Sequence, residues 1–150
     1  MFGHEVAAHH TDGTPCTVLL GLADDQHRTI LTLPAAETVT VSVDVSGIAE
    51  LVTAILSGHI TYVPVRHAVH GDRLLGVHAH TPECAVPQDA DCGPRQLYLE
   101  LPGGQVHEVV LDPLAATWFV RYLDEVWRLI DAVGYGPACR HFRVLPPLGD

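Results

Sequence analysis

The sequence predicts an α+β domain with a mostly antiparallel sheet of about six to eight strands and two amphipathic helices, at 46–58 and 113–133. Three observations favour this class. Short runs of β-branched and apolar residues alternate with polar ones and are separated by turn residues. Only two stretches repeat their apolar residues with the helical period. Helices are therefore too few to connect the strands of a doubly wound parallel sheet.

The first part of the chain is expected to be strand-rich after a polar leader at 1–14. The segments 16–23 and 28–33 resemble two strands joined by a short polar connection. Residues 38–45 alternate strictly, with four valines on one face and polar side chains on the other. That alternation is typical of a half-buried strand.

The first helix is predicted from apolar residues at i, i+3, i+4, i+7 and i+8, namely Ile48, Leu51, Val52, Ile55 and Leu56. Ser46 is expected at its N-cap, because its side chain can accept a bond from a free backbone N–H. Gly58 is expected to end the helix in the left-handed conformation.

Four more strands are expected in two hairpins: 60–70 with 73–80, turning at Gly71-Asp72, and 95–101 with 105–111, turning at Pro102-Gly103-Gly104. Asp112 followed by Pro113 then predicts the start of the second helix. A last strand is expected at 138–145, before a tail at 146–150. The region 15–145 is thus predicted to be a single domain, in agreement with its length.

The charge of the chain excludes some partners. Eighteen acidic residues and eight basic ones give a net charge of −10, which argues against binding to nucleic-acid phosphates and suits a basic protein partner. All eight basic residues are Arg, and the chain has neither Lys nor Asn. Both missing residues use AA-starting codons, so a GC-rich genome explains both losses together.

The sequence also indicates a cellular setting. It has no run of 18 apolar residues that would span a membrane, and its first residues lack the pattern of a secretory signal. A cytoplasmic protein is therefore expected. Its four cysteines, at 16, 84, 92 and 139, are expected to be reduced, and their spacing contains no C-x-x-C.

A candidate metal site lies in the middle of the chain, where His67, His70, His78, His80, Cys84 and Cys92 fall within 26 residues. A turn at Gly71-Asp72 would pair Val65 with His78 and place His67, His78 and His80 on one sheet face. Imidazoles at this spacing can meet one Zn²⁺ ion, with Cys84 or Cys92 as loop-borne ligands. The alternative is that the same face belongs to the core and carries histidines at its edge.

The second helix offers a candidate surface for a protein partner. Trp118 and Trp127 lie away from its predicted buried stripe, with Arg121 and Arg128 nearby. Aromatic residues and Arg are enriched at protein interfaces. The alternative is a wide buried face that covers both indoles.

The order of elements carries a family resemblance. An alternating strand that enters a helix (TVTVSVDVSGIAELVTAIL), a strand (RLLGVHAH), and VVLDPLAATWFVRYL before a final strand (ACRHFRVL) resemble the small immunity proteins of actinobacterial polymorphic toxin systems. The resemblance covers residues 38–145. It implies a cytoplasmic protein that neutralises a toxin by covering its active site.

Two functions are therefore expected. The first is non-catalytic, immunity-like binding of a protein partner, such as a basic toxin or another enzyme that acts on nucleic acid. The second is a metal-binding module or small metal-dependent enzyme that uses the His67, His78 and His80 face. No cofactor other than this zinc-like ion is indicated.

Overall fold

The computed structural model describes residues 3–23, 28–34, 37–80 and 88–134 of the 150-residue chain. Its elements follow in the order β1 (Gly3–His9), β2 (Pro15–Leu22), β3 (Thr29–Leu33), β4 (Val39–Val43), α1 (Val45–Ser57), β5 (Thr61–His67), β6 (Gly71–Ala79), β7 (Arg95–Leu101), β8 (Gln105–Leu111) and α2 (Pro113–Gly134). The predicted α+β class, with its mostly antiparallel sheet and two helices, is confirmed. The expected last strand at 138–145 lies outside the described residues.

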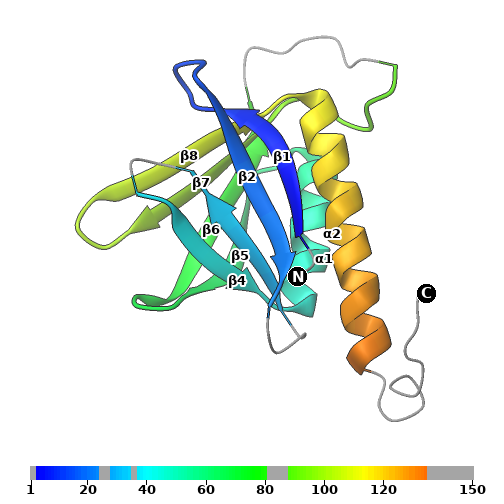
Figure 1. Ribbon diagram of the computed structural model, residues 1–150. Helices are drawn as coiled ribbons and strands as arrows, with labels where there is room; N and C mark the ends of the chain where they lie inside the picture. Colours follow the sequence, from blue (N-terminus) through cyan, green and yellow to red (C-terminus); the bar gives the residue numbers. More distant parts are fainter. Residues whose placement is uncertain (1–2, 24–27, 35–36, 81–87, 135–150) are drawn as a thin grey trace.

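The eight strands form a closed barrel in which each strand pairs antiparallel with the next along the chain. The sequence analysis did not predict this closure. The two helices lie side by side along one flank of the barrel (Figure 1). Their buried residues join the inward side chains of the strands in one apolar core. The largest of these buried side chains is Phe119 of α2.

The barrel consists of two successive units, each with four strands followed by a helix. The units meet along two narrow seams. At the β4–β5 seam the paired residues are Val41 with His67 and Ser42 with Arg66. At the β1–β8 seam, His9 pairs with Val110. Pairing inside each unit is more extensive, since β1 and β2 alone pair over seven residues.

The first strand corrects the prediction of a polar leader at 1–14. Gly3–His9 forms β1, whose register places Val6 opposite Val18 of β2. Val6 is the one residue of β1 that is fully buried. A strand with a single core residue has almost no alternating pattern, so its sequence resembles a solvated segment.

The N-cap of α1 is a second correction. Asp44, not Ser46, accepts a hydrogen bond from the Gly47 N–H at 2.8 Å, and the Ser46 hydroxyl also donates to Asp44. Two expected helix boundaries are confirmed. Gly58 ends α1 with φ of 73°, and Asp112 accepts a bond from the Ala115 N–H at 2.8 Å at the start of α2.

A third correction concerns the β5–β6 turn. It lies at residues 68–70, so His67 pairs with Gly71 rather than with Gly76. The reason is the apolar pattern of both strands. With Val63 opposite Leu75, the residues Val63, Val65, Leu75 and Val77 all face the core, whereas a turn at Gly71-Asp72 would have paired Val65 with His78.

A buried arginine joins the two units near the end of α1. Arg95 of β7 donates through Nε to the carbonyl of Ile55, through a terminal nitrogen to Leu56 at 3.4 Å, and through the other to Pro94 at 3.0 Å. A cation at a helix C-terminus compensates the carbonyls that have no partner within the helix. Arg95 therefore closes α1 from outside.

None of the helices described here is long and apolar enough to cross a lipid bilayer.

Candidate binding surfaces

The histidines of the expected metal site are separated by the sheet. His67 follows Val63 and Val65 on the inward side of β5 and lies at the end of the barrel. His78 faces outward and pairs with Gln96 of β7, and His80 Nδ1 lies 3.4 Å from Gln96 Oε1. The prediction that His67 shares a face with His78 and His80 is therefore wrong, because it depended on the wrong turn.

The cysteines do not restore a metal site within the described residues. Cys92 is buried in the apolar core, and burial raises the pKa of its thiol, which disfavours the thiolate that binds metals. Cys84 lies outside the described residues. Within the described ranges, no group of three or more His, Cys, Asp or Glu side chains could hold a metal ion.

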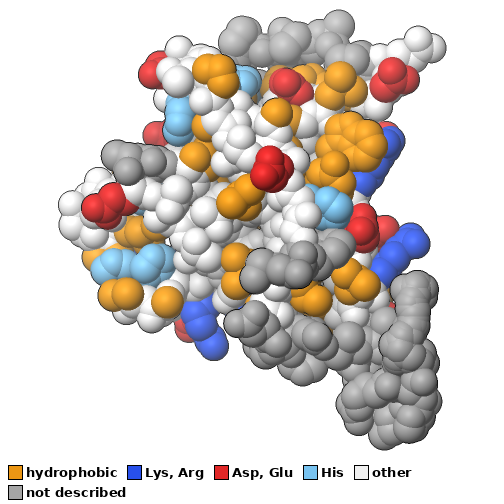
Figure 2. All heavy atoms as spheres, in the orientation of Figure 1, with side chains coloured by type: hydrophobic (Ala, Val, Ile, Leu, Met, Phe, Trp, Pro, Cys, Tyr) orange, Lys and Arg blue, Asp and Glu red, His pale blue; other side chains and the backbone are white. Residues whose placement is uncertain are grey.

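His67 has a structural role instead. Its Nδ1 accepts hydrogen bonds from the backbone N–H groups of Val69 and His70, both at 3.1 Å, which closes the β5–β6 turn. Its ring stacks on that of His70, with 4.9 Å between the ring centres. On the face drawn in Figure 2, histidine side chains lie beside apolar ones at the barrel edge that carries hairpin turns.

His107 of β8 is the buried histidine of this region. It is 7% exposed, and neither ring nitrogen has a hydrogen-bond partner in the described part of the chain. Burial, followed by the electrostatic effect of His67, lowers the pKa of His107. The ring is therefore held neutral inside the barrel.

The four residues predicted on α2 divide into two pairs. Trp118 is 48% exposed, and the Arg121 guanidinium lies 5.2 Å from the centre of its ring. Arg121 also lies 3.9 Å from Asp91. Trp127 instead packs partly buried against the core, and Arg128 pairs with Asp124 on the helix surface at 3.0 Å. Only Trp118 and Arg121 thus form a joint exposed surface.

A larger surface lies on the outside of β5, β6 and β7. It is an open groove of about 860 Å³, which also reaches Arg28 and Asp44 across the β4–β5 seam. We call it the seam groove. Its lining residues are Arg28, Asp44, Tyr62, Pro64, Val65, Arg66, Asp72, Arg73, Leu74, Tyr98, Glu100, Leu101 and Pro102.

Apolar and aromatic side chains form the middle of the seam groove. Tyr62 is 60% exposed and Leu74 55% exposed, although both are large. Gly76 lies between Tyr62 and Tyr98 in the sheet register. A Cβ atom at Gly76 would lie 3.4 Å from Tyr62 Cε1 and 3.6 Å from Tyr98 Cβ, which are contact distances, so both tyrosines border this position.

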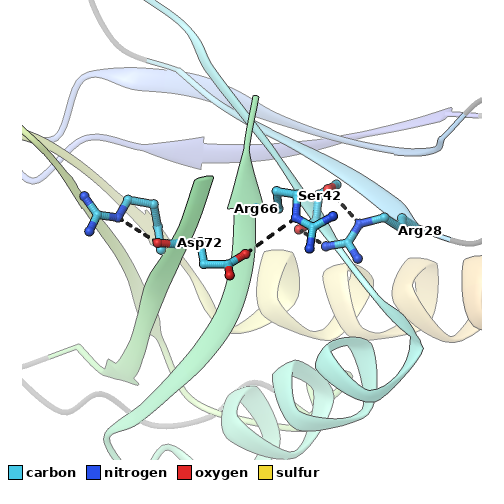
Figure 3. Close-up of polar contacts among 5 residues, drawn as sticks. Arg28, Ser42, Arg66 and Asp72 are labelled. Carbon is cyan, nitrogen blue, oxygen red and sulfur yellow. Dashed lines mark hydrogen bonds and ion pairs between the residues drawn. The ribbon is translucent and has the colours of Figure 1, made fainter. Parts of the chain in front are cut away.

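Arginines gather at the seam end of the groove, as Figure 3 shows. Arg28 donates through Nε to the Ser42 hydroxyl at 2.8 Å and through a terminal nitrogen to the Ser42 carbonyl at 3.1 Å. Arg66 pairs with Ser42 across the seam, and its Nε lies 3.5 Å from Asp72 Oδ1. Two guanidinium groups from different units therefore meet beside one serine.

Asp44 lies within the electrostatic reach of both arginines. The backbone N–H of Gly47 lowers the pKa of the Asp44 carboxyl most, and the Ser46 hydroxyl, Arg28 and Arg66 lower it further. Asp44 is thus charged and already occupied as the N-cap of α1.

The seam groove could not be found from sequence alone. Its residues come from three strands and from connections at Arg28, Asp44 and Pro102, and Tyr62 and Tyr98 meet only through the register of β5, β6 and β7. The available signal was weak: Tyr62, Pro64 and Arg66 alternate with buried valines in β5. A proline inside a strand points to a sheet edge, and Pro64 does lie next to the narrow seam.

Comparison of the chain with protein-family models, with curated protein sequences and with solved structures gives no match.

Proposed function

We propose that this protein binds a protein partner through the seam groove and performs no chemical step of its own. The observation that carries the proposal is the exposure of Tyr62 and Leu74 in a concave surface bordered by arginines. Tyr and Arg dominate the binding energy of protein interfaces when they lie in such a setting. Large exposed apolar side chains in a hollow also mark an interaction site.

The composition of the groove supports binding over catalysis. Among the described residues, its lining includes no His, Cys, Ser or Thr. These residue types supply most nucleophiles and general bases. Two of its carboxylates already have partners, since Asp44 caps α1 and Asp72 pairs with Arg66.

An immunity-like role in the cytoplasm is the more specific form of this proposal. It is supported by the order of the elements, from the Val39–Val43 strand and its helix to the long α2 helix. The net charge of −10 favours a partner with a basic surface, such as a toxin that acts on nucleic acid.

The proposal is tested by affinity capture from the source cells with immobilised protein and matched variants. We expect a stoichiometric partner to be retained by the unmodified chain and lost with Tyr62→Ala and with Leu74→Ser. Leu19→Ser is the control, because Leu19 is 42% exposed on β2 and does not line the groove. A partner that all variants retain equally, or no partner at all, would contradict the proposal.

A further inference from the structure

We infer that the segment of the partner that occupies the seam groove is an acidic peptide with apolar residues, which places a carboxylate between Arg28 and Arg66. This inference rests on the proposed function, and it names the chemistry of the bound segment. It differs from what the charge of the whole chain suggests, because the net charge of −10 alone favours a basic partner.

The groove is locally different in charge from the rest of the protein. Three of the eight arginines line it, but only three of the eighteen acidic residues do. The two sets therefore balance in the groove, inside a chain with a large excess of negative charge. An acidic segment would be repelled from the protein as a whole and tolerated best at this place.

The groove arginines keep donors for a ligand. In the described part of the chain, the bonds of Arg66 and Arg73 use Nε: Arg66 meets Asp72 Oδ1, and Arg73 donates to the Asp72 carbonyl at 3.1 Å. Bonding through Nε orients each guanidinium and leaves its two terminal amino groups available. Such a fork fits a carboxylate through two parallel hydrogen bonds.

Two of the three acidic groups of the groove already accept hydrogen bonds from their neighbours, and the third, Asp72, pairs with Arg66. The Asp44 carboxylate accepts bonds from Gly47 and Ser46, and Glu100 accepts one from the Tyr98 hydroxyl at 3.3 Å. In the described part of the chain, a ligand carboxylate would meet the two terminal amino groups of Arg66 and the one that Arg28 does not use for Ser42. A ligand ammonium group would have to share carboxylates that already have partners. The geometry thus favours an anionic ligand group at the seam end.

The middle of the groove favours a ligand that carries apolar side chains next to its carboxylate. Tyr62, Pro64 and Leu74 offer an apolar surface on adjacent strands, and Pro64 opposes Leu74 in the register. Neither single-stranded nucleic acid nor a free anion would cover Leu74 as well as apolar side chains would. An acidic peptide with interspersed apolar residues satisfies both parts of the groove.

The test uses two fluorescein-labelled peptides of about ten residues, identical in their Leu and Phe positions, with Glu in one and Lys in the other. Fluorescence anisotropy with the full chain is expected to show at least about tenfold tighter binding of the Glu peptide. Arg66→Gln should weaken this binding about tenfold, because it removes a charge-assisted contact.

Matched variants separate the groove from general charge. Arg128→Gln also removes one positive charge, but Arg128 lies on the surface of α2 and pairs with Asp124, so binding should not change. Arg66 is well exposed, and circular dichroism should show that Arg66→Gln keeps the fold. Tyr62→Ala should weaken the Glu peptide without changing the preference for Glu over Lys.

Several results would overturn the inference: equal or tighter binding of the Lys peptide, no binding of either peptide at about 1 mM, or the same loss with Arg128→Gln as with Arg66→Gln. Tighter binding of a single-stranded oligothymidylate than of the Glu peptide would overturn it too. These failures leave the proposed function standing if capture of the partner still depends on Tyr62 and Leu74. The proposed function fails separately if it does not.

Discussion

Replacing Arg95 with Met is expected to destabilise the fold by about 3 kcal/mol. Arg95 is a buried cation, and it holds the carbonyls of Ile55, Leu56 and Pro94 at the end of α1. Methionine fills much of the same space but donates no hydrogen bond. The carbonyls of Ile55 and Leu56 would then lose this donor, which is the costly outcome, whereas the Pro94 carbonyl keeps a bond from the His80 N–H at 3.0 Å.

The magnitude follows from the individual bonds. The bond to Ile55 is short and made by a charged donor, so it contributes about 1.5–3 kcal/mol, and the bond to Pro94 contributes less because that carbonyl also accepts from the His80 N–H. The bond to Leu56, at 3.4 Å, adds little. Apolar burial of the methionine side chain offsets part of the loss. For a chain of this size, about 3 kcal/mol corresponds to a fall in Tm of about 6–12 °C.

Urea unfolding followed by circular dichroism measures the change in the free energy of unfolding. Arg128→Met is the matched control, because Arg128 makes an exposed i,i+4 pair with Asp124, and its loss should cost about 0.5 kcal/mol or less. Arg95→Lys should fall between the two, since it keeps the charge but loses the fork geometry. A loss below about 1 kcal/mol for Arg95→Met would refute the reasoning.

Three further predictions concern buried or capping side chains. His107→Leu should stabilise the fold by about 1–2 kcal/mol near neutral pH, because a buried ring without partners is replaced by an apolar side chain. The pKa of His107 is lowered on folding, so the unfolded chain binds more protons than the folded chain as the pH falls below about 6.5, and the free energy of unfolding decreases. Urea melts at several pH values should show this decrease for the unmodified chain and not for His107→Leu. Iodoacetamide labelling followed by peptide mapping should modify Cys92 more slowly than Cys16, which is only partly buried, and equal rates would contradict the buried position of Cys92. Asp44→Ala should cost about 1 kcal/mol through loss of the α1 N-cap, and a thermal melt indistinguishable from that of the unmodified chain would show that the cap is dispensable.

The elements with a strong local pattern were predictable from the sequence. The strict alternation around Val41 and the Asp112-Pro113 start of α2 each specify one element without help from the rest of the chain. The left-handed end of α1 at Gly58 follows from the same kind of local rule. These signals work because each depends on backbone geometry within a few residues.

The register of the strands and the closure of the barrel depend on contacts between residues far apart in the sequence, so local sequence patterns could not predict them. Gly71-Asp72 resembles a two-residue turn, yet the burial of Val63 opposite Leu75 shifts the turn to 68–70. An odd shift in register exchanges the two faces of a strand, so it separated His67 from His78 and removed the expected metal geometry. The same register produced the tyrosine-lined groove that the sequence did not reveal.

On α2, the local pattern was correct about Trp118 and misleading about Trp127. Both indoles lie off the main apolar stripe in sequence, but Trp127 packs partly buried against the core. A helical period gives the direction of a side chain and not the width of the surface that covers it. Only the position of α2 relative to α1 and the first strands decides that width.

The narrow β4–β5 seam gives the protein a mechanical property. Few backbone bonds join β4 to β5, so local opening of this seam should cost less than opening within either unit, and amide hydrogen exchange should report it as early exchange along the seam. Arg28 and Arg66 lie on opposite sides of the β4–β5 seam. A molecule that contacts both arginines would hold the two units together, and it would reduce opening along the whole seam rather than the motion of one loop.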